Sequence, residues 1–309
     1  IFHNFAIFHK NLAMEGEYYN VIQPSNILDL PEDFFINHLA KYLSLKDLFT
    51  LRCCSQNCKD LVERMFTVRR EVIICGWKIS LGAADPPNVI KFLANACRRL
   101  HRLYLLDIWW MKDDTLLPLL NNNPCLEVVD FLGCADITEK GLYPLSVQCK
   151  NLKSLMIEGS SCSDQFLDTI TLHNNHLVEV NLSCQLDLSP ESVNAFFEKQ
   201  PHLKTILLLG MKRGKPRGIN FKTILGTIGD VCKDLENLDI RRNLMNDVGD
   251  QDVLKCLKIR YLLIDNITLN LLNGSTVEFL ESRNIITKYK SISGYESHPF
   301  YLSEVLKRC

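Results

Sequence analysis

Cysteine is the residue type that could do the most chemistry in this sequence, which has 13 cysteines among 309 residues. A thiolate can bind a metal ion or act as a nucleophile. Several cysteines recur three residues before a repeated leucine pattern, at a position occupied in turn by Cys97, Asn123, Cys149, Asn174, Gln200, Cys232 and Cys256. The ligands of one metal ion must converge on a point, whereas this column extends along the chain. We therefore interpret the column as packing residues, because a free cysteine behaves as a small hydrophobe.

A second group of thiols, Cys53, Cys54 and Cys58, has no histidine nearby in sequence. A catalytic cysteine needs a neighbouring base and a lowered pKa, and the sequence argues for neither. It also contains no glycine-rich phosphate loop, no paired metal motif and no nucleophile elbow. We expect no catalytic residue, no cofactor and no metal, with all thiols free as in the cytoplasm or nucleus. A reactive-cysteine enzyme is an alternative that selective labelling of these three thiols would reveal.

Positive charge is concentrated in a segment rich in glycine and proline, whose cationic residues are Lys212, Arg213, Lys215 and Arg217. Such a composition predicts a loop, and Arg241 and Arg242 follow the next leucine pattern. Cationic side chains bind carboxylates and phosphates. The segment therefore predicts a clamp for an acidic or phosphorylated part of a partner, with a solvated insertion as the alternative.

The net charge of −1 argues against a general binder of nucleic acid or anionic membranes, which would need a broad basic field. No run of residues reaches the ~18–20 apolar residues that span a bilayer. The adjacent Trp109 and Trp110 indicate protein binding instead, since tryptophan is enriched in interface hot spots. Because the two residues adjoin, we expect at most one of the two rings to pack inward.

A repeat positions these residues. The frame L-x-x-L-x-L, with other aliphatic residues allowed, begins at Leu100, Leu126, Leu152, Leu177, Leu203, Leu235 and Ile259. Spacings of 26, 26, 25, 26, 32 and 24 residues match leucine-rich repeats of about 20–29 residues, apart from one insertion that holds the basic segment. Each frame predicts a short strand with one buried face, followed by a turn and a helix. We predict an α/β leucine-rich-repeat solenoid with a curved parallel sheet and helices on its convex side, extended by strands at Val72–Cys75 and at Ile285 and Ile286.

Helix starts can be read at Thr138, at Ser163, and at Ser189 followed by Pro190. A capping box is predicted where Glu278 follows Ser275 by three residues. The repeat consensus also places Asn or Cys three residues after the last leucine of each frame. Only Cys134 and Asn243 match it. The polar ladder, the row of hydrogen bonds that these side chains make between repeats, is therefore expected to be broken.

Strand residues that alternate with the buried ones point to the concave surface. They form one column of Tyr104, Asp130, Met156, Asn181, Leu207, Asp239 and Leu263, and a second of Leu106, Leu132, Glu158, Ser183, Leu209, Arg241 and Asp265. This many apolar residues on an open face marks either an interaction site or a face covered by another element, for which the C-terminal tail is a candidate. We predict that a protein substrate binds the loop cations together with Tyr104, Trp109, Trp110, Met156, Leu207, Leu209 and Arg241.

Residues 27–66 lack the repeat and predict three short helices. Pro31 and Glu32 suit the start of the first helix. The expected apolar stripes are Phe35, Leu39, Tyr42 and Leu43 on the first helix, Leu48, Leu51 and Cys54 on the second, and Cys58, Leu61, Val62 and Met65 on the third. Ser44 and Asp47 are expected to cap the second helix. Three helices in about 40 residues bury too little surface to be stable alone, so the module should bind a partner or the next domain.

This module resembles an F-box, and its position before the repeats resembles the F-box/leucine-rich-repeat family. The matching residues are Leu30-Pro31, Leu39, Leu43-Ser44-Leu45, Lys46-Asp47-Leu48, Leu51 and Cys54-Ser55. The sequence departs from the family pattern at Cys54 and Cys58, where the family usually has Val and Trp. Its first helix is also one residue longer than the commonest spacing.

The resemblance implies a substrate-recognition subunit of a SKP–cullin–F-box (SCF) ubiquitin ligase, which is not itself an enzyme. In the family, the F-box binds a SKP-type adaptor that joins a cullin and a RING subunit, and the repeats hold a protein substrate for ubiquitination and proteasomal degradation. The adaptor-binding residues implied here are Leu30, Pro31, Phe35, Leu39, Leu43, Leu48, Leu51 and Cys54. Internal packing of the helices is the alternative role for the apolar ones.

We expect a disordered segment at residues 1–26 with translation starting at Met14, an F-box at 27–68, repeats at 69–290, and a tail or cap at 291–309. The expected location is the cytoplasm or nucleus, without nucleic-acid or membrane partners. A repeat scaffold or inhibitor that binds a partner without any ligase is the alternative function, since it needs only the repeats.

Overall fold

A computed structural model of the chain describes residues 31–39, 42–76, 86–211, 220–243, 248–256, 259–265, 269–283 and 285. The chain forms two compact units. The first contains the residues up to Arg69 together with Asn95–Arg99, and the second contains Arg70–Ala94 and the residues from Leu100 onward.

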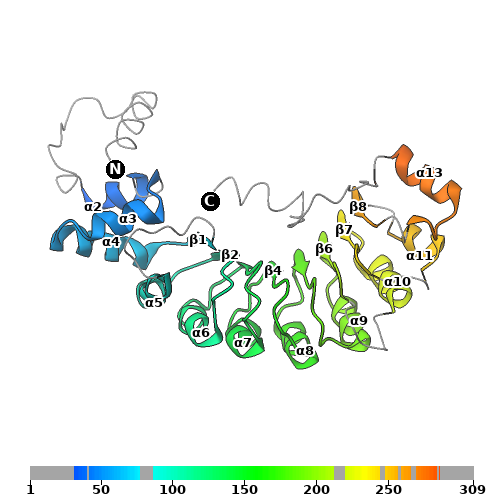
Figure 1. Cartoon of the computed structure of the whole chain (residues 1–309), viewed down its shortest axis with the longest axis horizontal. Helices are drawn as coiled ribbons and strands as arrows, with labels where there is room; N and C mark the ends of the chain where they lie inside the picture. The colour runs from blue at the N-terminus through cyan, green and yellow to red at the C-terminus, as the bar shows by residue number, and fades with distance from the viewer. Residues whose placement is uncertain are drawn as a thin grey trace. The chain divides into compact units, whose positions relative to one another are not determined.

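The first unit is helical, with α2 at Glu32–Phe34, a π-helix η2 at Phe35–Leu39, α3 at Leu45–Arg52 and α4 at Gln56–Val68 (Figure 1). The π-helix lies in the segment where the sequence predicts a first helix that is one residue longer than usual. Because a π-turn closes over five residues instead of four, it accommodates an insertion without shifting the helix that follows.

Caps fix the helices that follow the π-helix. Ser44 Oγ accepts a hydrogen bond from Asp47 N (3.1 Å), while Asp47 Oδ2 accepts one from Ser44 N (3.1 Å), so the predicted capping box of α3 is present. Ser55 Oγ caps α4 by accepting from Cys58 N (3.1 Å). The interior consists of Phe35, Leu39, Leu43, Leu48, Leu51, Cys58, Leu61, Val62, Met65 and Phe66. Two stripe predictions are wrong, because Tyr42 is exposed after η2 and Cys54 is exposed beyond the end of α3.

The second unit is built on a parallel sheet of eight strands in which each strand pairs with the next one along the chain. The strands are β1 Glu71–Cys75, β2 Arg102–Leu106, β3 Val128–Asp130, β4 Ser154–Met156, β5 Glu179–Asn181, β6 Thr205–Leu207, β7 Asn237–Asp239 and β8 Tyr261–Leu263. All seven leucine frames and the predicted first strand are therefore strands. The amide of Leu262 in β8 donates to the carbonyl of Ile285 (2.8 Å), whereas Ile286 lies outside the described residues.

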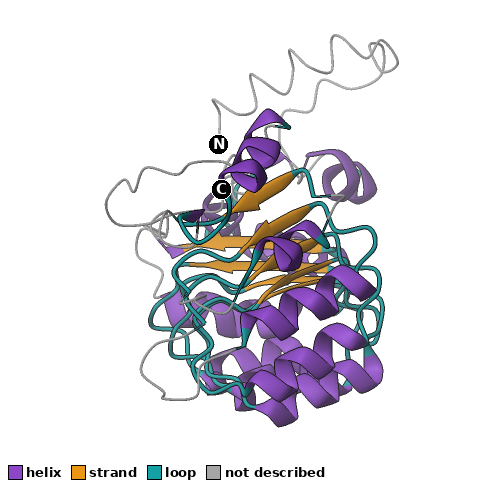
Figure 2. Ribbon diagram, turned by 90° about the vertical axis from the view of Figure 1, so that its right-hand side faces the viewer, coloured by secondary structure: helices purple, strands orange, loops and turns teal. Residues whose placement is uncertain are grey.

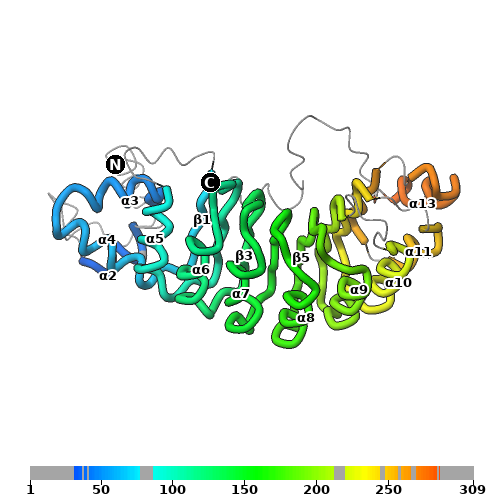
Figure 3. Tube along the Cα trace, turned by 60° about the horizontal axis from the view of Figure 1, so that its bottom comes forward, coloured from blue at the N-terminus to red at the C-terminus, as the bar shows by residue number. Residues whose placement is uncertain are grey.

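Helices connect successive strands and cover one face of the sheet (Figure 2). They are α5 Pro86–Ala96, α6 Asp113–Asn121, α7 Glu139–Val147, α8 Asp164–His173, α9 Pro190–Glu198, α10 Phe221–Val231, α11 Asp250–Leu254 and α13 Gly274–Ser282. Figure 1 shows α6–α10 on the outer, convex side of the arc and the strands on its inner side. Figure 3 shows the repeats stacked in chain order. The second unit is the predicted α/β leucine-rich-repeat solenoid.

Each repeat turns away from its strand through a residue in the left-handed backbone conformation. The residues in this column have φ between 55° and 75°, and they are Asp107, Gly133, Gly159, Cys184, Gly210 and Arg242. At Gly133 the turn also requires the absence of a side chain, because a Cβ there would lie 2.9 Å from Asp107 Cα and 3.3 Å from Asp107 N. The backbone of one repeat is thus packed directly on that of the repeat before it.

Acidic residues at the first position of several helices bind the cap of the next helix. Asp113 of α6 accepts from Thr138 N (2.8 Å) and Oγ1 (2.6 Å). Asp164 of α8 likewise accepts from Ser189 N (2.8 Å). Glu139 accepts from Ser163, and Asp250 from Asn273 (2.8 Å). Each carboxylate is stabilised by its own helix N-terminus while it satisfies an amide of the neighbouring repeat.

This last contact explains why the predicted capping box at Ser275 is wrong. Asn273 is the N-cap of α13, so Ser275 lies inside the first turn. The three predicted starts at Thr138, Ser163 and Ser189 are N-caps, with Pro190 at the first helical position.

Candidate protein-binding surfaces

The predicted adaptor-binding residues separate into exposed and buried sets. Pro31 and Cys54 are exposed, and Leu30 lies outside the described residues. The others have at most 8% of their surface exposed, and they are Phe35, Leu39, Leu43, Leu48 and Leu51. In this conformation the buried set packs inside its own unit. The sequence stripe also misassigned Tyr42, which is 45% exposed and is the large apolar side chain most open to a partner near η2.

The predicted substrate face is not open. Tyr104, Met156, Leu207 and Leu209 are each no more than 6% exposed. The helices of the repeats lie on the opposite face of the sheet, as Figure 2 shows. Of the two alternatives for these positions, an open interaction site and a covered face, the burial excludes the open site in this conformation. Strand alternation correctly gives the face to which a side chain points, but it does not reveal what lies above that face.

Arg241 was predicted to bind substrate together with the cations of the loop at Lys212–Arg217, but in the structure its charge is paired. Its Nη2 donates to Asp239 Oδ2 (2.7 Å) and its Nε donates to Asp239 Oδ1 (3.0 Å). Arg241 is 4% exposed and Asp239 is fully buried. The carboxylate offsets the guanidinium charge, because both groups are held in one desolvated, bidentate pair. The loop cations Lys212, Arg213, Lys215 and Arg217 lie outside the described residues.

The rim where strands lead into helices is more accessible than the sheet. Trp109 is 71% exposed and Trp110 is half-buried, so the two rings diverge as adjacent side chains should. Leu186, at the corresponding place after β5, is 45% exposed. These side chains are apolar anchors available on the described surface without any rearrangement.

The residues three positions before each leucine frame form contacts between successive repeats. Asn123 Oδ1 accepts from Leu100 N (3.0 Å) and its Nδ2 donates to Leu119 O (2.8 Å). Cys232 Sγ donates to the carbonyl of Gln200 (3.4 Å) in the same column one repeat earlier. The packing interpretation of this column is confirmed by these contacts.

The polar ladder after each frame is less broken than the consensus predicts. Cys134 Sγ donates to Leu105 O (3.2 Å), and Asn243 Nδ2 donates to Leu208 O (2.6 Å). Gln185, which the consensus does not include, donates to Ile157 O (2.6 Å). Its longer side chain reaches the preceding repeat as the consensus Asn does. Ile108 and Met211 occupy the same place without a polar side chain.

One thiol differs from the others. Cys75, at the end of β1, is disulfide-bonded, so the prediction that all thiols are free is wrong. Every other cysteine in the described part of the chain is free. Among the described residues there is no cluster of His, Cys, Asp and Glu that could hold a metal ion.

We expect the buried thiols to resist alkylation at pH 8. Burial raises the pKa to about 12 for the thiols of Cys97, Cys134, Cys149, Cys162 and Cys232. They therefore stay protonated at pH 8 and are shielded from the reagent. Mass spectrometry after brief iodoacetamide treatment should find Cys53, Cys54 and Cys125, which are exposed, modified first. Equal labelling of Cys134 and Cys125 in folded protein would contradict this.

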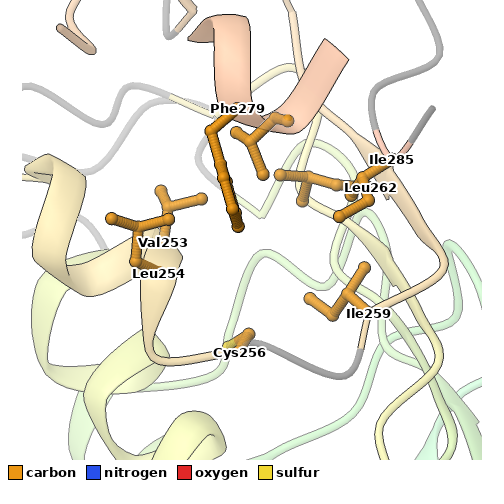
Figure 4. Close-up of a pocket in the computed structure, with 8 residues that line it drawn as sticks. Val253, Leu254, Cys256, Ile259, Leu262, Phe279 and Ile285 are labelled. Carbon is orange, nitrogen blue, oxygen red and sulfur yellow. The ribbon is translucent and has the colours of Figure 1, made fainter. Parts of the chain in front are cut away.

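A small apolar pocket lies between α11, β8 and α13 at the end of the repeats (Figure 4). The ring of Phe279 points between Val253 and Leu254 on one side and Leu262 and Ile285 on the other. The side chains that line the pocket are apolar apart from the thiol of Cys256, so they offer no set of polar groups to orient a ligand. We interpret it as a packing gap in the last repeat.

None of the helices in the described part of the chain is long and apolar enough to cross a membrane.

Comparison with known proteins finds one family match and similar curated proteins. Residues 27–67 match the F-box domain family. F-box/LRR-repeat protein 15 of Mus musculus is 27% identical over 125 residues, which are 40% of this chain and 40% of that protein. The protein of the same name from Rattus norvegicus is 27% identical over the same shares. The alignment thus spans well under half the length of these relatives.

Two solved structures align over most of the chain. The crystal structure of the Rad7 and Elc1 complex in yeast aligns over 98% of this chain and 93% of that one, with a TM-score of 0.40 and 13% identity. The leucine-rich-repeat protein LegL7 of Legionella pneumophila aligns over 79% and 92%, with a TM-score of 0.36 and 12% identity. The chain thus carries an F-box match at residues 27–67, followed in sequence by a leucine-rich-repeat sheet, and over part of its length it is similar to F-box/LRR-repeat protein 15.

Proposed function

We propose that this protein is a non-catalytic substrate-recognition subunit of an SCF-type ubiquitin ligase. The observation that carries the proposal is the F-box match at residues 27–67 followed directly by a leucine-rich-repeat sheet. An F-box joins its chain to a ligase through a SKP-type adaptor, and a repeat solenoid offers a long surface for a protein partner. The target would be ubiquitinated and degraded by the proteasome, in the cytoplasm or nucleus.

The F-box unit supports adaptor binding through the surface that it leaves apolar. Pro31 and Cys54 are exposed, and Tyr42 has nearly half of its surface open. The buried set, which includes Phe35 and Leu48, holds the helices that carry these residues. We therefore assign adaptor contact to the exposed set and to Leu30, and a positioning role to the buried set. Substitution of the buried set would also reduce binding, but it would do so by unfolding the unit.

We expect a Leu30→Ala, Pro31→Ala double variant to bind a purified SKP-type adaptor at least about tenfold more weakly, by the loss of about 1.4 kcal/mol or more of contact energy. Binding is measured by calorimetry with the full chain. The matched control is Gln56→Ala, Asn57→Ala, which changes two exposed residues at the start of α4. Circular dichroism should show the same helix content in both variants. Unchanged affinity in the first variant would remove the support for an F-box that docks at this site.

The substrate surface proposed for the repeats has two parts. The rim residues Trp109 and Trp110 are accessible in the conformation described here. Tyr104, Met156, Leu207 and Leu209 are buried, and they would bind a substrate only in a conformation that exposes them. The cations Lys212, Arg213, Lys215 and Arg217 add encounter rate for an acidic or phosphorylated target. Their substitution by serine should slow association and flatten its dependence on salt.

A repeat scaffold or inhibitor without a ligase is the alternative function. It would use the same repeats, but it would have no need of an F-box that binds the adaptor. Calorimetry with the adaptor therefore discriminates between the two functions before any substrate is identified.

A further inference from the structure

Two large apolar side chains are exposed on the rim where strands lead into helices. Trp109, after β2, is 71% exposed, and Leu186, after β5, is 45% exposed. Both occupy the third position before the N-cap of the helix that follows, since those N-caps are Lys112 and Ser189. An apolar side chain in water gains none of the free energy that burial would give it, and tryptophan is enriched among the anchors of protein interfaces. The rim therefore presents two apolar anchors at the same step of the repeat.

The intervening repeats carry small side chains at this step. The third position before the N-caps of α7 and α8 holds Ala135 and Ser160. We call these four residues the anchor row, because Trp109 and Leu186 stand at its two ends. The strands from β2 to β5 pair in chain order, so at about 4.8 Å per strand the two anchors lie roughly 14 Å apart. An extended chain covers that distance in about four residues.

A second row, here called the acidic row, lies beside the anchors at the second position before the same N-caps. It consists of Trp110, Asp136, Ser161 and Asp187. Ser161 Oγ donates to Asp187 Oδ2 (3.3 Å), so members of this row in successive repeats are neighbours. Asp136 and Asp187 are both exposed, and Asp136 has no hydrogen-bond or ion-pair partner in the described part of the chain. One carboxylate thus lies between the two anchors and the other lies beside Leu186.

Helix capping does not explain the carboxylates of the acidic row. Asp113, Glu139 and Asp164 occupy the first helical position and bind the cap of the next helix, so their charge serves the fold. Asp136 and Asp187 stand two residues before the N-caps, and neither is itself a cap. A carboxylate has about four acceptor sites, so the hydrogen bond from Ser161 leaves Asp187 able to accept from a partner.

Charge at the opposite edge, where helices lead into strands, is neutralised between repeats. Glu127 accepts from Lys153 Nζ (2.7 Å), and its other oxygen lies 2.9 Å from His101 Nδ1. The basic residues nearest to the acidic row in sequence, Lys112 and Lys140, lie at the starts of α6 and α7 and outside both rows. The two rows carry negative charge alone. Their charge therefore complements a cationic partner.

We propose that the rim from Trp109 to Leu186 binds an extended basic segment of a protein partner, which places apolar side chains on the two anchors and cations on Asp136 and Asp187. Apolar residues four positions apart, with cations between them, match the spacing of the anchors. Contact with the anchors supplies most of the affinity, whereas the carboxylates fix orientation and speed encounter. Only the identification of this segment as part of a ligase substrate rests on the proposed function.

Fluorescence anisotropy with a labelled peptide tests this surface. The probe is fluorescein-Gly-Leu-Arg-Lys-Arg-Leu-Ser-amide, whose leucines stand four positions apart around three cations. The full chain should bind it with a dissociation constant of about 100 µM or tighter at low salt. Binding should weaken several-fold between about 50 and 300 mM salt, because salt screens exposed charges. A peptide with Gln at the three cationic positions should bind at least about tenfold more weakly, and equal binding of the two peptides would overturn the proposal.

The anchors are tested by Trp109→Ser, Leu186→Ser, which should weaken binding of the probe at least about tenfold. The matched control is Tyr143→Ser, which removes a side chain that is 59% exposed on α7, outside both rows. Its affinity for the probe should equal that of the unaltered chain. An equal loss in the two variants would overturn the assignment of the anchors.

The carboxylates are tested by Asp136→Asn, Asp187→Asn, which should weaken binding several-fold and flatten its dependence on salt. The control is Asp168→Asn, Asp230→Asn, which removes the same charge from exposed positions on α8 and α10. This control should change neither quantity. An unchanged salt dependence in the first variant would overturn the role of the acidic row.

Adaptor affinity, measured on the same samples, separates this proposal from the ligase. All the substituted side chains are exposed, so circular dichroism should show the same helix content in every variant. Failure of the unaltered chain to bind the probe, with adaptor affinity intact, would overturn the rim proposal alone. Failure to bind the adaptor, with probe binding intact, would count against the ligase and not against the rim.

Discussion

Arg241→Met is expected to lower the free energy of unfolding by about 3–5 kcal/mol, because it removes the guanidinium that forms a bidentate pair with the buried carboxylate of Asp239. The side chains of Arg241 and Asp239 are 4% and 1% exposed and are joined by a 2.7 Å ion pair. Methionine preserves much of the volume of arginine but neutralises none of the charge of Asp239. The measurement is urea unfolding followed by circular dichroism, with midpoint and slope fitted together.

The neighbouring Arg242→Met is the matched control. Arg242 is exposed and its backbone amide, which the substitution leaves in place, donates to Asp265 (3.0 Å). Its substitution should change stability by less than about 0.5 kcal/mol, as at most surface sites. A similar loss in both variants would show that the Arg241–Asp239 pair is not desolvated.

Gly133→Ala is expected to lower the free energy of unfolding by about 3 kcal/mol or more, because it combines backbone strain with a steric clash. Gly133 has φ 75°, and its new Cβ would lie 2.9 Å from Asp107 Cα, which is backbone and cannot rotate away. The turn at Asp107 leads into Trp109, so the rim should also lose order. Thermal and urea unfolding measure the stability, and tryptophan fluorescence reports on the rim.

Gly159→Ala separates the two causes. Gly159 has φ 73°, but no atom lies within 4 Å of its added Cβ. Only the conformational strain remains there, about 1–2 kcal/mol. The difference between the two variants is therefore the cost of the clash between neighbouring turns. Equal losses would mean that the two turns are not packed as closely as the structure places them.

The strands and the helix layer could be predicted from sequence because the leucine frame reports a local property, the alternation of buried side chains. Each frame from Leu100 to Ile259 became a strand, and three of four predicted helix starts are N-caps. The fourth start failed because a contact between repeats, Asp250 with Asn273, decides the cap. The carboxylates Asp113, Glu139 and Asp164 recur directly after predicted caps or at helix starts, a spacing that could have revealed the ladder.

The interaction surfaces were less predictable because burial depends on distant segments. The pattern placed Met156 and Leu207 on the concave face correctly, but it could not decide between an open interaction site and a covered face. The pair of Arg241 and Asp239, by contrast, could have been predicted, because period-two alternation places the two residues on the same face. The disulfide at Cys75 was missed because a compartment argument treats all thiols alike.

Direct binding of the full chain to a purified SKP-type adaptor in complex with its cullin tests the central claim most directly. We predict a 1:1:1 complex in size-exclusion chromatography with light scattering, with a dissociation constant of about 1 µM or tighter. The affinity should fall at least about tenfold in the Leu30→Ala, Pro31→Ala variant and stay unchanged in the Gln56→Ala, Asn57→Ala control. Failure of the folded, unaltered chain to bind would contradict the assignment of this protein to an SCF-type ligase.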